Sequence, residues 1–217
     1  MVEIYNAHEQ GEVVKKWLQE NGSAIVMGLV IAFGGLFGFK WWQNWQETNR
    51  QAASTEYEVM GQLLASDQLD AAMANFQSLQ DDHGKSPYAS MAALQMARAR
   101  MEVNQPDLAI SLLEYVVGSG YPQAMRVVAR ERLARVLLDQ GRAEEALVTL
   151  DGATDITGFE ARYAEVRGDI LLDLGRTDEA VAAYQESLEA LEEGVGDRNK
   201  LVMKLESMGA EIPGSGS

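Results

Sequence analysis

The sequence contains no cysteine, only two histidines and only four prolines among its 217 residues. Without cysteine the chain can form neither a disulfide framework nor a thiolate metal site, and it has no thiol nucleophile. Neither His8 nor His83 stands in a pattern that would give a catalytic base an orienting partner. Phosphate-loop, HExxH and nucleophile-elbow motifs are also missing. We therefore expect no enzymatic activity, no cofactor and no small-molecule substrate.

One short segment, Asp81-Asp82-His83, has side chains that could bind a metal ion. A solvated loop between helices is the more common role of such a segment, and we expect no metal site there. The carboxylate pairs Glu144/Glu145 and Asp178/Glu179 fit the first turns of helices, where negative charge suits the helix dipole.

The net charge of −15 is unevenly distributed. Of 18 basic and 33 acidic residues, residues 1–50 hold four and five, which leaves 14 basic and 28 acidic residues in residues 51–217. A part of the chain with a charge of −14 is repelled by nucleic acid and by anionic lipid. This charge argues against a nucleic-acid partner.

An uncharged apolar segment runs from residue 21 to residue 39. As a helix that includes the tryptophans beyond it, it can cross a hydrocarbon core of about 30 Å. A buried helix of a soluble protein would not have every tryptophan at its two ends, and a signal peptide would need a basic start and a small-residue cleavage site. The sequence predicts an uncleaved transmembrane helix over residues 23–42, with these residues at the membrane interfaces: Trp17, Trp41, Trp42 and Trp45.

Small residues recur within this predicted helix at intervals of four. Such spacing lets a second membrane helix approach closely, although glycine is common in membrane helices in general. The candidate packing residues are Ala24, Gly28, Ala32, Gly34 and Gly38. Two lysines precede the span, and one lysine and one arginine follow it, so the charge count leaves its orientation open.

A repeat of 34 residues is the strongest pattern in the remaining chain. The segments LLDQGRAEEALVTL and LLDLGRTDEAVAAY are copies of one unit, and their spacing resembles the tetratricopeptide repeat. Small residues allow the two helices of each unit to approach, and glycine in a left-handed conformation ends the first helix. The residues that define the repeats are Ala97, Ala109, Ala134, Gly141, Ala146, Gly168, Gly175 and Ala180.

Two divergent copies precede these, and Asn104 stands in place of the turn glycine in the second of them. The extra length between the second copy and the next is expected in a loop at residues 118–122. An amphipathic helix near residues 197–208 is expected to cap the array, with Leu201, Val202 and Leu205 facing in. The prediction is an all-α protein in which a transmembrane helix precedes a solenoid of about four helical hairpins. Its expected parts are an N-terminal segment (1–22), the membrane helix (23–42), a helical stalk (43–55), the repeat domain (56–208) and a flexible tail (209–217).

Stacked helical hairpins form a concave surface lined by the first helix of each hairpin. In the tetratricopeptide frame, the candidate groove residues are Arg98, Glu102, Glu131, Arg135, Asp139, Arg162, Glu165 and Asp169. Each of them singly could equally be a solvated surface residue. Because the set mixes both signs and leans acidic, we expect a basic or weakly polar, extended client rather than an acidic peptide terminus.

The N-terminal sequences EIY, VKKW and ENG, the tryptophans after the apolar segment and the repeats together resemble the YfgM family of ancillary SecYEG translocon subunits. The resemblance covers the whole chain and is most specific before the apolar segment. It implies a bacterial inner-membrane protein with a cytoplasmic N-terminus and a periplasmic repeat domain. It also implies association with SecYEG and the periplasmic chaperone PpiD, and a role in passing unfolded, translocated clients to chaperones.

Ser23 stands where members of this family often have lysine, so the orientation rests on the resemblance and not on charge. Two other functions stay open at this stage. One is a scaffold for another envelope complex, such as cell division or outer-membrane assembly. The other is a regulator of an envelope stress response that acts through the cytoplasmic segment.

Overall fold

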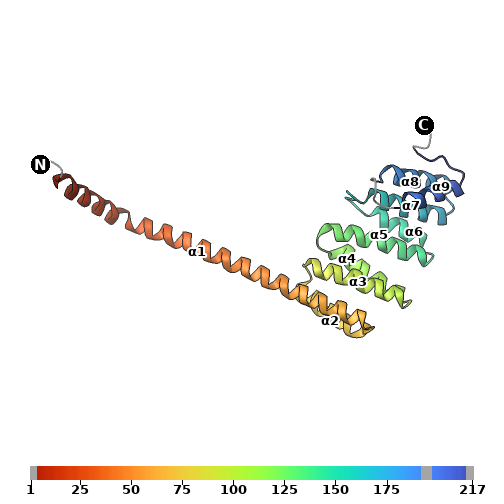
Figure 1. Ribbon diagram of the computed structural model, residues 1–217, viewed down its shortest axis with the longest axis horizontal. Helices are drawn as coiled ribbons and strands as arrows, with labels where there is room; N and C mark the ends of the chain where they lie inside the picture. Colours follow the sequence, from red (N-terminus) through yellow and green to blue (C-terminus); the bar gives the residue numbers. More distant parts are fainter. Residues whose placement is uncertain (1–3, 192–196, 214–217) are drawn as a thin grey trace. The chain divides into compact units, whose positions relative to one another are not determined.

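The computed structural model describes residues 4–191 and 197–213, with side chains from residue 11 onward except that of Val13. Every regular element in this part of the chain is an α-helix (Figure 1). The helices are α1 (Ile4–Ala65), α2 (Leu69–His83), α3 (Pro87–Glu102), α4 (Pro106–Ser119), α5 (Gln123–Asp139), α6 (Ala143–Asp151), α7 (Glu160–Asp173), α8 (Thr177–Glu189) and α9 (Arg198–Ser207).

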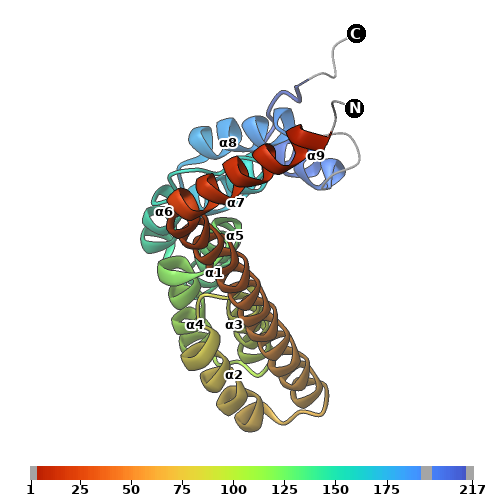
Figure 2. The same ribbon diagram turned by 90° about the vertical axis from the view of Figure 1, so that its left-hand side faces the viewer.

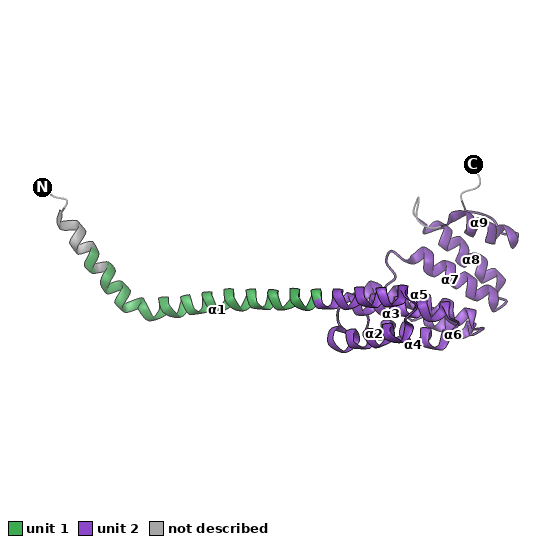
Figure 3. Ribbon diagram, turned by 60° about the horizontal axis from the view of Figure 1, so that its bottom comes forward, with its two compact units in different colours: residues 1–51 green, residues 52–217 purple. Residues whose placement is uncertain are grey.

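The chain divides into two compact units, residues 1–51 and residues 52–217 (Figure 3). The division falls inside the predicted stalk, residues 43–55, and the backbone of α1 is helical through this whole range. The C-terminal part of α1, from Ala53 onward, contributes buried residues to the core of the second unit.

The first unit is the apolar part of α1. This helix contains a stretch within Val14–Ala65 that is long and apolar enough to cross a membrane, and none of its most apolar window is buried. Large apolar side chains such as Val26, Phe37 and Trp41 are more than half exposed. A core helix of a soluble protein would bury such residues, so the apolar surface of this helix matches a lipid environment.

The second unit is a stack of helical hairpins, in which each helix contacts the next from α2 to α9. The first helices of successive hairpins also contact one another, α3 with α5 and α5 with α7. Figure 2 shows α3 and α5 on one side of the array and α4 and α6 on the other. This two-layer arrangement confirms the predicted tetratricopeptide-like solenoid.

Each hairpin turns at a residue with a positive φ. Gly141 and Gly175 have φ values of 70° and 72°, as the repeat predicts, and Asn104 has the same left-handed backbone with φ 56°. Asp67 (φ 56°) occupies this position in the first hairpin, which the sequence pattern did not identify. Asparagine and aspartate tolerate this conformation better than other residues with a Cβ atom.

Helix α9 is more than a cap, because it has the features of the first helix of a fifth repeat. Gly209 follows Gly175 by 34 residues and has a φ of 68°. The amide of Ala210 donates to Leu205 O at 3.0 Å, as the amide of Arg176 donates to Leu171 O at 2.9 Å. Leu205 is fully buried, as predicted.

The small residues that define the repeats lie where the two layers meet. Ala97, Ala109, Ala134, Ala146 and Ala180 are all buried. Their lack of bulk lets the paired helices approach closely, which is the role that the repeat assigns to them.

Two connections differ from the prediction. The Asp81-Asp82-His83 segment forms the last turn of α2 instead of a loop, because α2 continues to His83. Gly118 and Ser119, which the sequence predicts in the loop at residues 118–122, belong to the end of α4 instead. In both places the helix continues for about a turn beyond the position where the repeat pattern weakens.

Candidate protein-binding surface

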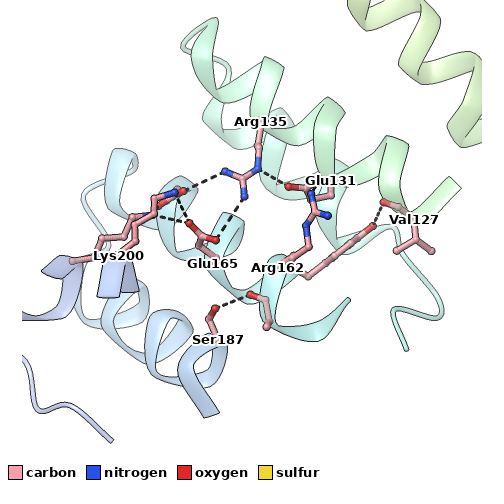
Figure 4. Close-up of polar contacts among 11 residues, drawn as sticks. Val127, Glu131, Arg135, Arg162, Glu165, Ser187 and Lys200 are labelled. Carbon is pink, nitrogen blue, oxygen red and sulfur yellow. Dashed lines mark hydrogen bonds and ion pairs between the residues drawn. The ribbon is translucent and has the colours of Figure 1, made fainter. Parts of the chain in front are cut away.

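The predicted groove residues all lie on first helices of the hairpins. Five of the eight meet in one polar network on the inner face of α5 and α7 (Figure 4). The other three lie outside it. Arg98 and Glu102 form an exposed ion pair within α3, with Arg98 Nε 2.9 Å from Glu102 Oε1, and Asp139 is exposed at the C-terminal end of α5.

Glu131 is the buried centre of the network. Its side chain is 2% exposed, and it accepts hydrogen bonds from two arginines. Arg135 Nε donates to Glu131 Oε1 at 2.5 Å, and Arg162 Nη2 donates to Glu131 Oε2 at 3.1 Å. A buried carboxylate without such partners would be strongly destabilising, so the hydrogen bonds from these two arginines compensate for the burial of Glu131 between α5 and α7.

Arg135 connects Glu131 to a second acidic site on α7. Its Nη2 lies 3.8 Å from Glu165 Oε2, and its Nη1 lies 3.9 Å from Asp169 Oδ2. Burial by itself would lower the pKa of Arg135, but the hydrogen bond to Glu131 and the charges of all three carboxylates raise it overall. Arg135 is therefore a permanent cation in this network.

Two lysines of α9 complete the network, and sequence analysis did not identify them. Lys200 Nζ lies 2.8 Å from Glu165 Oε1, and Lys204 Nζ lies 3.3 Å from the same oxygen and also forms an ion pair with Asp169 Oδ1. The available signal was their spacing of four residues beside Leu201 and Leu205, which places both lysines near the buried face of one helix.

One of these lysines, Lys204, also contacts Tyr184 of α8. Lys204 Nζ lies 4.9 Å from the centre of the Tyr184 ring, and the Tyr184 hydroxyl donates to Asp169 Oδ1 at 2.6 Å. Burial and the nearby carboxylates raise the pKa of Tyr184, so its hydroxyl stays protonated and acts as a donor. Burial raises the pKa of Glu165, but the hydrogen bond from Lys200 and the nearby cations lower it overall.

We call these seven residues the inner-face network: Glu131, Arg135, Arg162, Glu165, Asp169, Lys200 and Lys204. Three of its four cations are more exposed than its carboxylates. The side chains of Glu131, Glu165 and Asp169 are 2%, 18% and 22% exposed, whereas those of Arg135, Arg162 and Lys200 are 36%, 55% and 51% exposed. Lys204, at 22%, is buried as deeply as Asp169. The composition of the predicted groove leaned acidic, but the groups that this part of the surface exposes most are cationic.

Buried hydrogen bonds fix the helices that carry the network. The Tyr163 hydroxyl of α7 donates to Val127 O of α5 at 2.8 Å, and burial raises the pKa of Tyr163 to about 12. Ser187 Oγ of α8 donates to Ala161 O of α7 at 2.7 Å. The network therefore stands on a rigid, packed support.

The membrane-facing candidates in α1 have no packing partner within the described chain. A Cβ atom added at Gly28, Gly34 or Gly38 would meet no other atom within 4 Å, and Ala24 and Ala32 are exposed. The four tryptophans are all about half exposed or more. The packing role of the small residues remains a prediction that a partner helix would satisfy.

Among the side chains that the structure describes, no group of three or more His, Asp or Glu is arranged to hold a metal ion. The surface offers charged donors on a helical scaffold, and such donors can form ion pairs and hydrogen bonds.

Comparisons with known proteins agree with this architecture. Residues 15–210 match the family model described as a tetratricopeptide repeat-like domain. The solved structure of MamA, residues 41 to the end, from Desulfovibrio magneticus RS-1 has a TM-score of 0.54 and 17% identity over 72% of this chain and 82% of that chain. This likeness concerns the fold alone.

Two curated relatives share a name and nearly the whole length of the chain. The "Ancillary SecYEG translocon subunit" of Escherichia coli (strain K12) is 29% identical over 185 residues, covering 85% of this chain and 88% of that protein. The protein of the same name from Aggregatibacter actinomycetemcomitans is 32% identical over 189 residues, covering 85% of this chain and 91% of that protein. The chain therefore belongs to the family of ancillary SecYEG translocon subunits, as its N-terminal residues predict, and to the tetratricopeptide repeat-like domain family.

Proposed function

We propose that this protein is a membrane-anchored, protein-binding adaptor of the SecYEG translocon. The observation that carries the proposal is the match to proteins named ancillary SecYEG translocon subunits over 85% of the chain. The apolar part of α1 supplies a membrane anchor, and the hairpin array supplies a rigid surface for binding proteins.

The finer parts of the function follow from the family resemblance. The protein lies in the bacterial inner membrane as a single-pass protein, with its N-terminus in the cytoplasm and its repeat domain in the periplasm. There it acts together with PpiD and helps to transfer translocated, unfolded clients to the periplasmic chaperone network. It does this by binding and without catalysis, which agrees with an interaction fold whose charged residues pair with one another.

The anchor also serves as a docking helix in this proposal. Ala24, Gly28 and Ala32 follow one another at intervals of four residues, so they share one face of α1, and their side chains are free for close packing. Phe33 lies away from this face and also away from the face that Gly34 and Gly38 share. Positions 32 and 33 therefore provide a matched pair for an experiment.

The test is site-specific crosslinking in native membranes, followed by purification in mild detergent. A photo-crosslinking residue at position 32 is expected to capture translocon subunits, and the same residue at position 33 is expected to capture fewer. Recovery of only division or outer-membrane assembly proteins would refute the translocon adaptor and support an envelope scaffold. Capture of a cytoplasmic regulator through the segment before the membrane helix would instead support a regulator of an envelope stress response.

Orientation needs an independent measurement. Protease added to spheroplasts is expected to degrade the repeat domain while the cells remain intact, because the proposal places that domain in the periplasm. Protection of the repeats until lysis would overturn this orientation. A periplasmic and a cytoplasmic marker protein control for the integrity of the spheroplasts.

A further inference from the structure

The inner-face network has a charge opposite to that of the rest of its domain. Its four cations and three carboxylates give it a net charge of +1. Residues 51–217 hold 14 basic and 28 acidic residues, so the remainder of this part has 10 basic and 25 acidic residues. A net positive cluster within such an acidic domain is a specific feature of these seven side chains.

The cations of the network also exceed what the buried carboxylates require. One guanidinium is enough to neutralise Glu131, yet Arg135 and Arg162 both donate to it. Among the described residues, Arg162 forms its hydrogen bond through Nη2, which leaves the Nε and Nη1 donors of its exposed side chain available. The Nη atoms of Arg135 lie 3.8 Å and 3.9 Å from Glu165 and Asp169, beyond hydrogen-bond distance.

Lys200 adds a third exposed cation from α9. Its ammonium group has three donors, and among the described residues it donates to Glu165 alone. The buried carboxylates hold part of each charged group through hydrogen bonds. The donors that remain unpaired are therefore preorganised on one face of α5, α7 and α9 (Figure 4).

We propose that this face binds an extended acidic segment of a partner protein, whose carboxylates pair with Arg162, Arg135 and Lys200. The inference deepens the proposed adaptor function by naming the chemistry of a partner, and it reverses the client charge that composition alone indicated. Charge complementarity selects the partner: carboxylates accept the planar donors of arginine in pairs. An anionic membrane surface is a poorer partner, because 25 other carboxylates of the domain would approach it as well.

The test uses the full chain in neutral detergent and three labelled 12-residue peptides, which alternate serine with glutamate, glutamine or lysine. Fluorescence anisotropy is expected to show binding of the glutamate peptide only, with an affinity that falls as salt rises. Arg162→Gln combined with Lys200→Gln is expected to weaken this binding about tenfold, the effect of losing two charge-assisted contacts at a half-exposed surface. The matched control, Lys85→Gln with Arg132→Gln, removes the same charge at exposed positions outside the network and is expected to change binding less than twofold.

A third variant should change the affinity for the glutamate peptide in the opposite direction. Glu131→Gln removes the negative charge and one of the two acceptor oxygens that Arg135 and Arg162 use. It is expected to tighten binding of the glutamate peptide several-fold, whereas a variant that only damaged the fold would weaken it. Far-UV circular dichroism verifies that each variant is folded. Three results would each overturn the inference. They are an equal loss of binding in both double variants, stronger binding of the lysine peptide than of the glutamate peptide, and binding to phosphatidylglycerol vesicles in place of the peptide. If the unaltered chain failed to bind the glutamate peptide while translocon subunits were still recovered with it, the acidic-segment site would be refuted and the adaptor function would stand.

Discussion

Gly168 of α7 lies close against the ring of Tyr184 of α8, and replacing Gly168 with alanine tests this contact. A Cβ atom at position 168 would lie 2.5 Å from Tyr184 Cε1, 2.6 Å from Cδ1 and 2.9 Å from Cζ. All three atoms belong to the rigid aromatic ring, which cannot bend away as the end of a flexible side chain could. Tyr184 is 1% exposed and is held by its hydrogen bond to Asp169, so the ring has little room to move.

Two effects of opposite sign determine the result. Replacement of glycine by alanine inside a helix stabilises it by about 1 kcal/mol. Overpacking of a filled core costs roughly 1–3 kcal/mol, and weakening the Tyr184 hydrogen bond costs about 1 kcal/mol more. We therefore expect Gly168→Ala to lower the free energy of unfolding by about 1–3 kcal/mol.

Gly61→Ala is the matched control, since Gly61 also lies inside a helix but its added Cβ would meet only Gln95 Nε2 at 4.0 Å. This variant is expected to stabilise the fold by up to about 1 kcal/mol. The double variant Gly168→Ala, Tyr184→Leu reproduces the pair that the preceding repeat carries, Ala134 and Leu150. When Tyr184 is replaced by leucine, alanine at position 168 should no longer be destabilising. The expected coupling energy between positions 168 and 184 is about 2 kcal/mol.

Urea unfolding of the full chain in detergent, followed by far-UV circular dichroism, measures these differences. Tryptophan fluorescence is unsuitable, because all four tryptophans lie outside the repeat domain. If Gly168→Ala stabilised the protein as much as Gly61→Ala, the close approach of α7 and α8 at this position would be wrong. If the penalty persisted with leucine at position 184, the overlap with the ring would not be its cause.

Three further outcomes are expected. Tyr163→Phe should lower the free energy of unfolding by about 1 kcal/mol, because Val127 O loses its buried donor; an unchanged urea midpoint would contradict this. The pKa of Glu165 is lowered from 4.5, so its contribution to stability is complete above pH 4.5 and is lost as the pH falls through the lower pKa of the folded state. Thermal melting between pH 7 and 3 should show this loss. Replacing both Lys200 and Lys204 with glutamine should make the loss smaller. Gly34→Leu with Gly38→Leu should abolish recovery of the membrane-helix partner without changing the melting of the repeat domain, and unchanged recovery would exclude this packing face.

Local sequence signals were enough to predict most of the fold. The 34-residue period located the hairpins, and Gly141, Gly175 and Asn104 marked their turns because few other residues adopt a positive φ. The uncharged run bounded by tryptophans marked the membrane helix. Asp67 and the full extent of α9 as a repeat helix were missed, because divergent terminal repeats keep the backbone geometry but lose the diagnostic glycine or its neighbours.

The sequence by itself determined the helical repeat, the membrane anchor and the family of this protein, since these depend on the spacing and composition of neighbouring residues. Tertiary structure alone decided which charges of the groove are buried and which are exposed. Glu131 meets Arg162 from 31 residues away, and Glu165 meets Lys200 from 35 residues away, through the packing of α5, α7 and α9. Burial depends on contacts between distant helices, so residues of an acidic domain still form a network whose three most exposed side chains are cations.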